Sequence, residues 1–115
     1  MELSIHEYRQ ADVITIRGRV DSLSAEELSQ AIEGAHQHGK YNLVLDMSQV
    51  EFVSSAGLRA LIEAQRHTTA LGSGEITLAQ VPPRLKELLD MTGLSRDFRT
   101  FETVAAALAY ASKGL

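Results

Sequence analysis

The chain has 115 residues, of which 44% are hydrophobic and 23% charged, the composition of an ordinary globular domain rather than of a disordered or fibrous chain. We expect a single domain over residues 1–115, which leaves no room for a two-lobed enzyme with a cleft. Eleven Lys and Arg against 15 Asp and Glu give a formal charge of −4, with the two signs interspersed, so nucleic acid is not an expected partner. Because there is no cysteine, we expect no disulfide and no metal site.

No segment carries the run of about 18 apolar residues that a membrane-spanning helix needs. The first residues lack the basic and apolar regions of a signal peptide. We therefore expect a cytoplasmic protein without a membrane partner, and no repeat or linker divides the sequence.

The hydrophobic pattern changes its period along the chain and so predicts the order of the elements. Two β-branched runs around a polar turn predict an N-terminal hairpin, whose second strand ends at Gly18. Glycines that follow apolar stripes at helical spacing predict where helices end. In chain order we expect strands at 3–6 and 13–17, a helix from Ser24 up to Gly39, a strand at 43–46, a helix from Ser54 up to Gly72, a strand at 75–78, a helix from Pro83 up to Gly93, a weak strand at 98–101 and a helix at 104–111 capped by Thr103.

This order, β-β-α-β-α-β-α-β-α, predicts an α/β fold with a mixed, mostly parallel five-stranded sheet and four helices. Residues 43–45 are apolar on both faces, which is typical of a central strand covered by helices on both sides. Ser24 and Glu27 have the spacing of a capping box, in which each side chain bonds the other residue's backbone amide.

The segment from Asp46 to Leu58, predicted to be the loop before the second helix, is the most informative, because functional groups gather beyond the carboxyl ends of parallel strands. Its adjacent serines have two interpretations. In the first, Ser54 is only the helix N-cap and Ser55 the first helical residue. In the second, free amides and the helix dipole stabilise a phosphoryl group on Ser55, and Gly57 keeps the first turn small enough for a kinase to approach.

Patterns of known catalytic sites are missing from this segment. Ser55 is not a hydrolase nucleophile, because Val53 stands where a nucleophile elbow needs glycine, and no phosphate-binding P-loop occurs. A phospho-accepting Asp46 would need an acidic pair after the first strand and a late lysine. We instead expect Asp46 to bond backbone amides or the Ser48 hydroxyl, and we expect neither catalysis nor a cofactor.

Other polar residues are expected on solvent-facing surfaces. Arg59 and Arg66 flank Glu63 at helical spacing, which favours an ion-paired solvent face over an anion site. Solvated side chains are expected for all four histidines: His6, His36, His38 and His67.

The segment from Asp46 to Leu61 resembles the signature of STAS domains, and specifically that of the stand-alone bacterial anti-sigma-factor antagonists. Further matches at 18–21, 88–94 and 101–103 extend the resemblance over nearly the whole chain. It implies a switch protein without catalysis of its own. In this family an anti-sigma factor with serine kinase activity binds either a sigma factor or the antagonist, phosphorylation of one antagonist serine ends the second option, and a PP2C-type serine phosphatase restores it.

The family pattern Asp-Ser-Ser/Thr-Gly-Leu aligns its acceptor serine with Ser55. Ser54 then stands at the family's Asp position, where it is a competing acceptor, and Ala56 stands at the Ser/Thr position. Asp21 matches an aspartate at the end of the family's second strand, which implies that it lies near Ser55. The residues implied in the loop and in partner binding are Asp21, Asp46, Ser48, Ser54, Ala56, Gly57 and Arg59.

Two alternatives of other kinds remain. One is a STAS module that never cycles phosphate, such as the subunit of a lipid transporter or a ligand sensor. The other, of a different class, is a small serine or nucleotide hydrolase, which the missing catalytic patterns disfavour.

Overall fold

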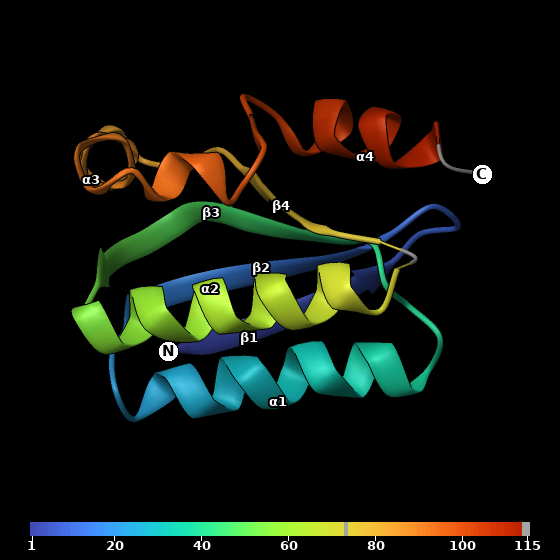
Figure 1. Cartoon of the computed structure of the whole chain (residues 1–115), viewed down its shortest axis with the longest axis horizontal. Coiled ribbons are helices and arrows are strands. Elements are labelled where there is room, and N and C mark those ends of the chain that lie inside the picture. Colours follow the sequence, from blue (N-terminus) through green and yellow to red (C-terminus); the bar gives the residue numbers. More distant parts are fainter. Residues whose placement is uncertain (73, 114–115) are drawn as a thin grey trace.

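The computed structural model describes residues 1–72 and 74–113, which form one five-stranded sheet in the order β1-β2-β3-β4-β5 (Figure 1). β1 pairs antiparallel with β2, and the other neighbours are parallel, so the predicted mixed, mostly parallel sheet is confirmed. The elements are β1 (Glu2–Glu7), β2 (Asp12–Val20), α1 (Ser24–Gln37), β3 (Leu43–Val53), α2 (Ser55–Ala70), β4 (Ile76–Ala79), α3 (Pro83–Thr92), a short 3-10 helix η1 (Leu94–Arg96), β5 (Thr100–Phe101) and α4 (Val104–Ser112).

Helices cover both faces of the sheet, with α1 and α2 on one side and α3 and α4 on the other (Figure 1). Leu43 and Leu45 of β3 belong to the larger core cluster, which α1, α2 and α3 complete. Val44, between them, belongs to a smaller cluster under α4. The apolar run at 43–45 therefore marks a central strand that is buried on both faces, as the sequence predicted.

β2 and β3 are both longer than the sequence pattern predicted. β2 continues past Gly18 to Val20, and β3 continues past Asp46 to Val53, with Val20 paired to Val53. The predicted end at Gly18 and the predicted loop at 46–53 are therefore wrong. Two irregularities in the β2–β3 register change which side chains face the core, so the buried residues of late β3 are three positions apart, at 47, 50 and 53. That spacing conceals a strand from any search for period-two alternation.

The predicted helix ends are confirmed, and only a few details differ elsewhere. Positive φ angles at Gly39, Gly72 and Gly93 follow the first three helices, and the Thr103 hydroxyl accepts the Ala106 N–H at 3.0 Å. The last strand shortens to Thr100–Phe101, and Phe98, predicted to begin it, lies in the core before the strand. None of the described helices is long and apolar enough to cross a membrane.

Candidate functional site

The site predicted from the sequence lies where β2 and β3 end side by side. The Ser54 N–H donates to the carbonyl oxygen of Val20 at 2.8 Å, which ties the end of β3 to the end of β2. Asp21 and Ser54 therefore leave the same edge of the sheet, and α1 and α2 both begin there, at the left of Figure 1.

The two adjacent serines have different surroundings. The half-buried Ser54 is the N-cap of α2, and its hydroxyl accepts the Gly57 N–H at 3.1 Å. Ser55 is the exposed first residue of α2, and its hydroxyl makes no hydrogen bond within the described residues. The predicted capping role of Ser54 is confirmed, and the Ser55 hydroxyl is available to another molecule.

Gly57 faces the protein interior. It is buried, and a Cβ added to it would lie 2.6 Å from the Val20 carbonyl oxygen and 3.0 Å from side-chain carbons of both Val20 and Val53. The expectation that this glycine opens the turn to a kinase is therefore wrong. Glycine at 57 lets the first turn of α2 sit directly on the ends of β2 and β3.

Asp21 lies before α1 and accepts backbone amides at the helix start, whereas the sequence predicted that Ser24 would cap this helix. One carboxylate oxygen of Asp21 accepts the backbone N–H groups of Leu23 and Ser24, each at 3.1 Å. The Ser24 hydroxyl accepts the Asp21 N–H at 2.9 Å, so the predicted capping box with Glu27 does not form. The backbone and side-chain hydrogen bonds from Ser24 hold the pKa of Asp21 below its usual value, which favours the charged carboxylate.

Asp46 and Ser48 lie further back along β3. Asp46 accepts the Ser48 N–H and the Gln80 side-chain amide, both at 3.1 Å, so the predicted bond to a backbone amide is confirmed. At about 3.3 Å per strand residue, the eight positions from Asp46 to Ser54 amount to roughly 25 Å. The structure therefore places Asp46 and Ser48 away from the two serines.

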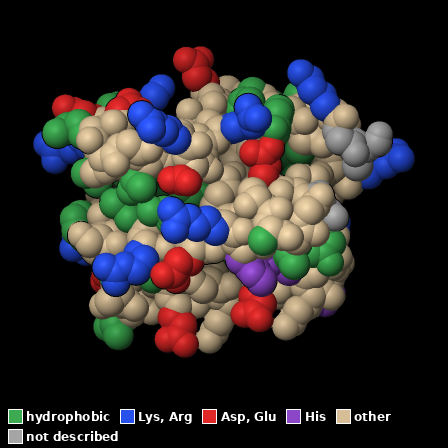
Figure 2. Space-filling model, viewed as in Figure 1, with side chains coloured by type: hydrophobic (Ala, Val, Ile, Leu, Met, Phe, Trp, Pro, Cys, Tyr) green, Lys and Arg blue, Asp and Glu red, His purple; other side chains and the backbone are tan. Residues whose placement is uncertain are grey.

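The outer face of α2 carries Arg59, Glu63 and Arg66. With Ser55, these residues line a shallow hollow of about 360 Å³. The ion pairs in the described part of the chain join Lys40 to Asp12 and Arg99 to Glu75, so neither arginine pairs with Glu63. The predicted ion-paired face is not formed, although positive and negative side chains are interspersed over this side of the molecule (Figure 2).

Sequence reasoning missed an apolar groove at the end of β3. The groove has a volume of about 450 Å³ and lies between the end of β3 and the first half of α3. Phe52 and Leu88 line it and are 44% and 38% exposed, and the Arg19 guanidinium lies 4.4 Å from the centre of the Phe52 ring. Leu88 is exposed although Leu85 and Leu89 of the same helix are buried, and only the structure reveals that exposure.

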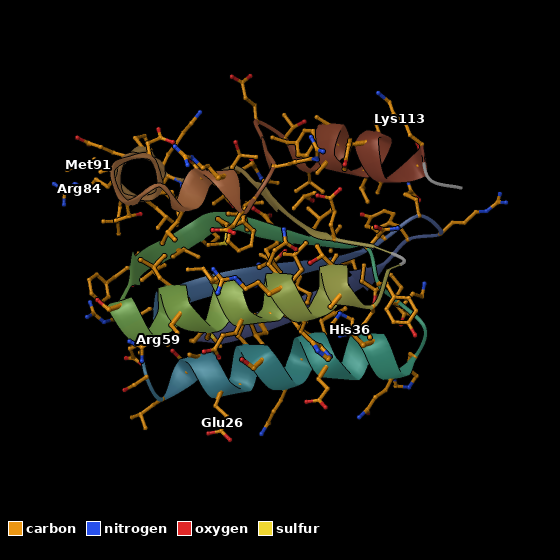
Figure 3. The ribbon with its side chains drawn as sticks, viewed as in Figure 1. Glu26, His36, Arg59, Arg84, Met91 and Lys113 are labelled. Atoms are coloured by element: carbon orange, nitrogen blue, oxygen red, sulfur yellow. The ribbon has the colours of Figure 1, made fainter. Side chains whose placement is uncertain are left out.

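His36 is buried, so the expectation that it is solvated is wrong; the other three histidines are exposed. Its ring reaches from α1 toward α2, where Nε2 lies 3.0 Å from the Thr68 hydroxyl (Figure 3). That hydroxyl donates to the Ala64 carbonyl at 2.7 Å, so His36 supplies the Nε2 proton as donor. Burial lowers the pKa of His36.

The described residues do not form a metal-binding site. Within residues 1–72 and 74–113, no group of three His, Asp or Glu side chains is placed to hold a metal ion. What the site offers is an accessible serine hydroxyl at the start of a helix, flanked by exposed arginine and apolar side chains.

Known proteins resemble this chain over nearly its whole length. The anti-sigma-F factor antagonist RsfB of Mycobacterium tuberculosis is 29% identical over 107 residues, which cover 92% of this chain and 85% of RsfB. The crystal structure of an anti-sigma factor antagonist from Mycobacterium paratuberculosis matches with a TM-score of 0.81 and 25% identity, covering 96% of this chain and 93% of that one. The Bacillus cell fate determinant SpoIIAA, in its phosphorylated form, shares the fold with a TM-score of 0.73 and 18% identity, covering 95% and 98% of the two chains.

A comparison with protein-family models gives the same result as these relatives. The model described as the STAS domain matches residues 2–107, from β1 into α4. The matched segment includes the strands, helices on both faces of the sheet, and the turn that carries Ser54 and Ser55. The chain therefore belongs to the STAS domain family.

Proposed function

We propose that the chain is an anti-sigma-factor antagonist whose binding is controlled by phosphorylation of Ser55. In the unphosphorylated form it binds an anti-sigma factor that is also a serine kinase, and a sigma factor is thereby released to act in transcription. A PP2C-type serine phosphatase restores the binding form. The names of RsfB and of the M. paratuberculosis protein support the antagonist role.

The observation that carries the proposal is the contrast between the two serine hydroxyls. Ser54 Oγ is used to cap α2, whereas Ser55 Oγ is exposed and has no hydrogen bond within the described residues. A kinase can therefore reach Ser55 without dismantling the helix start. The Ser55 oxygen forms a bond to the γ-phosphorus of ATP, the bond from that phosphorus to the leaving ADP breaks, and the hydroxyl proton passes to a kinase base.

The phosphorylated product is compatible with the fold. A phosphate on Ser55 carries about −1.5 to −2 charges and stands at the positive end of the α2 dipole, so it adds no strain to the free protein. A partner docked over Ser55 must instead accommodate that charge within an interface. Phosphorylation therefore weakens the complex without unfolding the chain.

The departure of this sequence from the family pattern has a physical explanation at Ser54. Aspartate and serine are comparably good N-cap residues, because each offers a side-chain oxygen to the backbone amides of the first turn. Ser54 performs this role through Gly57. The substitution therefore preserves the helix start and removes one negative charge beside the acceptor.

The test is incubation of the chain with ATP and a kinase-type anti-sigma factor, followed by phosphopeptide mass spectrometry. We expect phosphate on Ser55, none in Ser55→Ala, and none when the kinase is omitted. Ser54→Asp is the matched control, because it removes the competing hydroxyl but keeps the cap, and it is expected to be labelled. Undiminished labelling of Ser55→Ala would overturn the assignment.

The apolar groove favours one second candidate, a ligand-sensing STAS module that never cycles phosphate. Its volume of about 450 Å³ falls in the range of small-molecule sites, and Phe52 and Leu88 expose apolar surface to it. This candidate is favoured if a kinase-type anti-sigma factor binds the chain normally but never phosphorylates it.

A further inference from the structure

Arg59 lies one helical turn after Ser55 on the outer face of α2. Residues four apart on a helix are neighbours, with Cβ atoms about 5–6 Å from each other. Both side chains are exposed, and both line the hollow of about 360 Å³ on this face. A group attached to the Ser55 oxygen therefore lies within the space that the Arg59 guanidinium can reach.

No other side chain in the described part of the chain forms an ion pair with Arg59. Glu63 is its neighbour on the next turn, yet the two are not ion-paired, and no side-chain hydrogen bond to Arg59 is formed. Ser54 is uncharged, so the residue that precedes Ser55 offers no carboxylate to attract the guanidinium. A phosphate on Ser55 would be the strongest anion within reach of Arg59.

We propose that, once Ser55 is phosphorylated, Arg59 binds the phosphate and is thereby withdrawn from the exposed surface of α2. The inference rests on the proposed function, because it concerns the same serine. The planar guanidinium presents paired N–H donors that match two phosphate oxygens, and a dianionic phosphate attracts it more strongly than the singly charged Glu63.

This contact gives phosphorylation a second effect on the binding surface. The phosphate adds negative charge at Ser55, and the contact also takes the positive donors of Arg59 away from any partner that uses them. Arg66 lines the same hollow but lies 11 residues beyond Ser55, which is about 16 Å along the helix axis. It is out of reach of the phosphate and keeps its exposure.

The test uses the full chain with phosphoserine incorporated at position 55 during synthesis, so that no kinase is needed. Phosphorus NMR follows the second ionisation of the phosphate with pH. Because Arg59 favours the dianion, we expect a phosphate pKa lower by about 0.3 in the unmutated chain than in Arg59→Gln. The difference is expected to shrink in roughly 1 M salt, since an exposed pair is screened.

Arg66→Gln is the matched control, because it removes the same charge from the same hollow at a distance, and its phosphate pKa is expected to stay within about 0.1 of the unmutated value. Equal pKa values in the unmutated chain and Arg59→Gln would overturn the inference, as would an equal change in Arg66→Gln. These outcomes are independent of the kinase assay. Failure of the kinase to label Ser55 would contradict the proposed function and leave the titration unaffected.

Discussion

The Cβ position of Gly57 lies 2.6 Å from the carbonyl oxygen of Val20, so the first turn of α2 rests on the last residue of β2. The same carbonyl oxygen accepts the Ser54 N–H at 2.8 Å. The end of one strand thus fixes both the N-cap and the first turn of the helix that presents Ser55.

Gly57→Ala is expected to destabilise the protein by about 1–3 kcal/mol, because the added methyl group must displace backbone or two packed valines. Helix propensity alone predicts the opposite, a gain of about 1 kcal/mol. Gly34→Ala, in α1, is the matched control: its Cβ meets nothing within 4 Å, so it should be neutral or stabilising. Urea unfolding of both variants decides between packing and propensity, and a Gly57→Ala protein as stable as the unmutated chain would refute the close contact.

Ser54→Ala is expected to cost about 1 kcal/mol of unfolding free energy, since the Gly57 N–H loses its acceptor. Ser54→Asp should retain most of the stability by supplying another oxygen. Ser55→Ala should change stability by less than about 0.5 kcal/mol, because the Ser55 side chain is exposed and makes no bond within the described residues. Thermal melts of the three variants measure these differences, and equal losses in Ser54→Ala and Ser55→Ala would contradict the assigned roles.

His36 is expected to make stability depend on pH in the weakly acidic range. Burial lowers its pKa in the folded state, chiefly by disfavouring the charged form, with His67 opposing protonation and Glu33 favouring it. In the unfolded chain this histidine binds the proton at about pH 6.5, so the stability that the neutral ring contributes is fully present above that pH. It is lost as the pH falls from 6.5 toward the folded-state pKa.

Urea titrations at about pH 7.5 and pH 5.5 measure this effect, with His36→Gln as the comparison. The unmutated chain should lose more stability over this interval than His36→Gln, which cannot gain the proton. His38→Gln is the matched control, because the His38 side chain is exposed, and it should behave like the unmutated chain. The same pH dependence in all three proteins would show that His36 is not the source.

Local signals in the sequence predicted much of the fold. Periodic apolar residues and terminal glycines located the helices, and the hydroxyls of Ser54 and Thr103 cap α2 and α4 as expected. These features depend on residues a few positions apart, so a linear pattern contains them. The resemblance of the segment at 46–61 to STAS domains then identified the family.

Features that depend on distant residues were not predictable. The late part of β3 is a strand because irregular pairing with β2 buries residues 47, 50 and 53. Similarly, His36 is buried where α2 brings Thr68 against it, 32 positions away, and where its ring stacks on Tyr41. The Asp21 carboxylate accepts the Ser24 N–H because β2 extends to Val20 and places Asp21 at the start of α1. Each of these errors comes from tertiary contacts that outweigh a local preference.

The proposed function requires that negative charge at Ser55 separates the chain from its partner without unfolding it. Ser55→Asp should fold normally, since a carboxylate in the first turn of α2 is favoured by about 0.3–1 kcal/mol. An unpaired charge buried in an interface costs several kcal/mol, and each 1.4 kcal/mol is a factor of about ten in affinity.

Calorimetric titration of a kinase-type anti-sigma factor with the unmutated chain, Ser55→Ala and Ser55→Asp is the decisive measurement of this effect. We expect similar affinities for the first two and a loss of about a hundredfold or more for Ser55→Asp, with matching thermal melts. Near-equal affinities for all three stable proteins would contradict the proposed function.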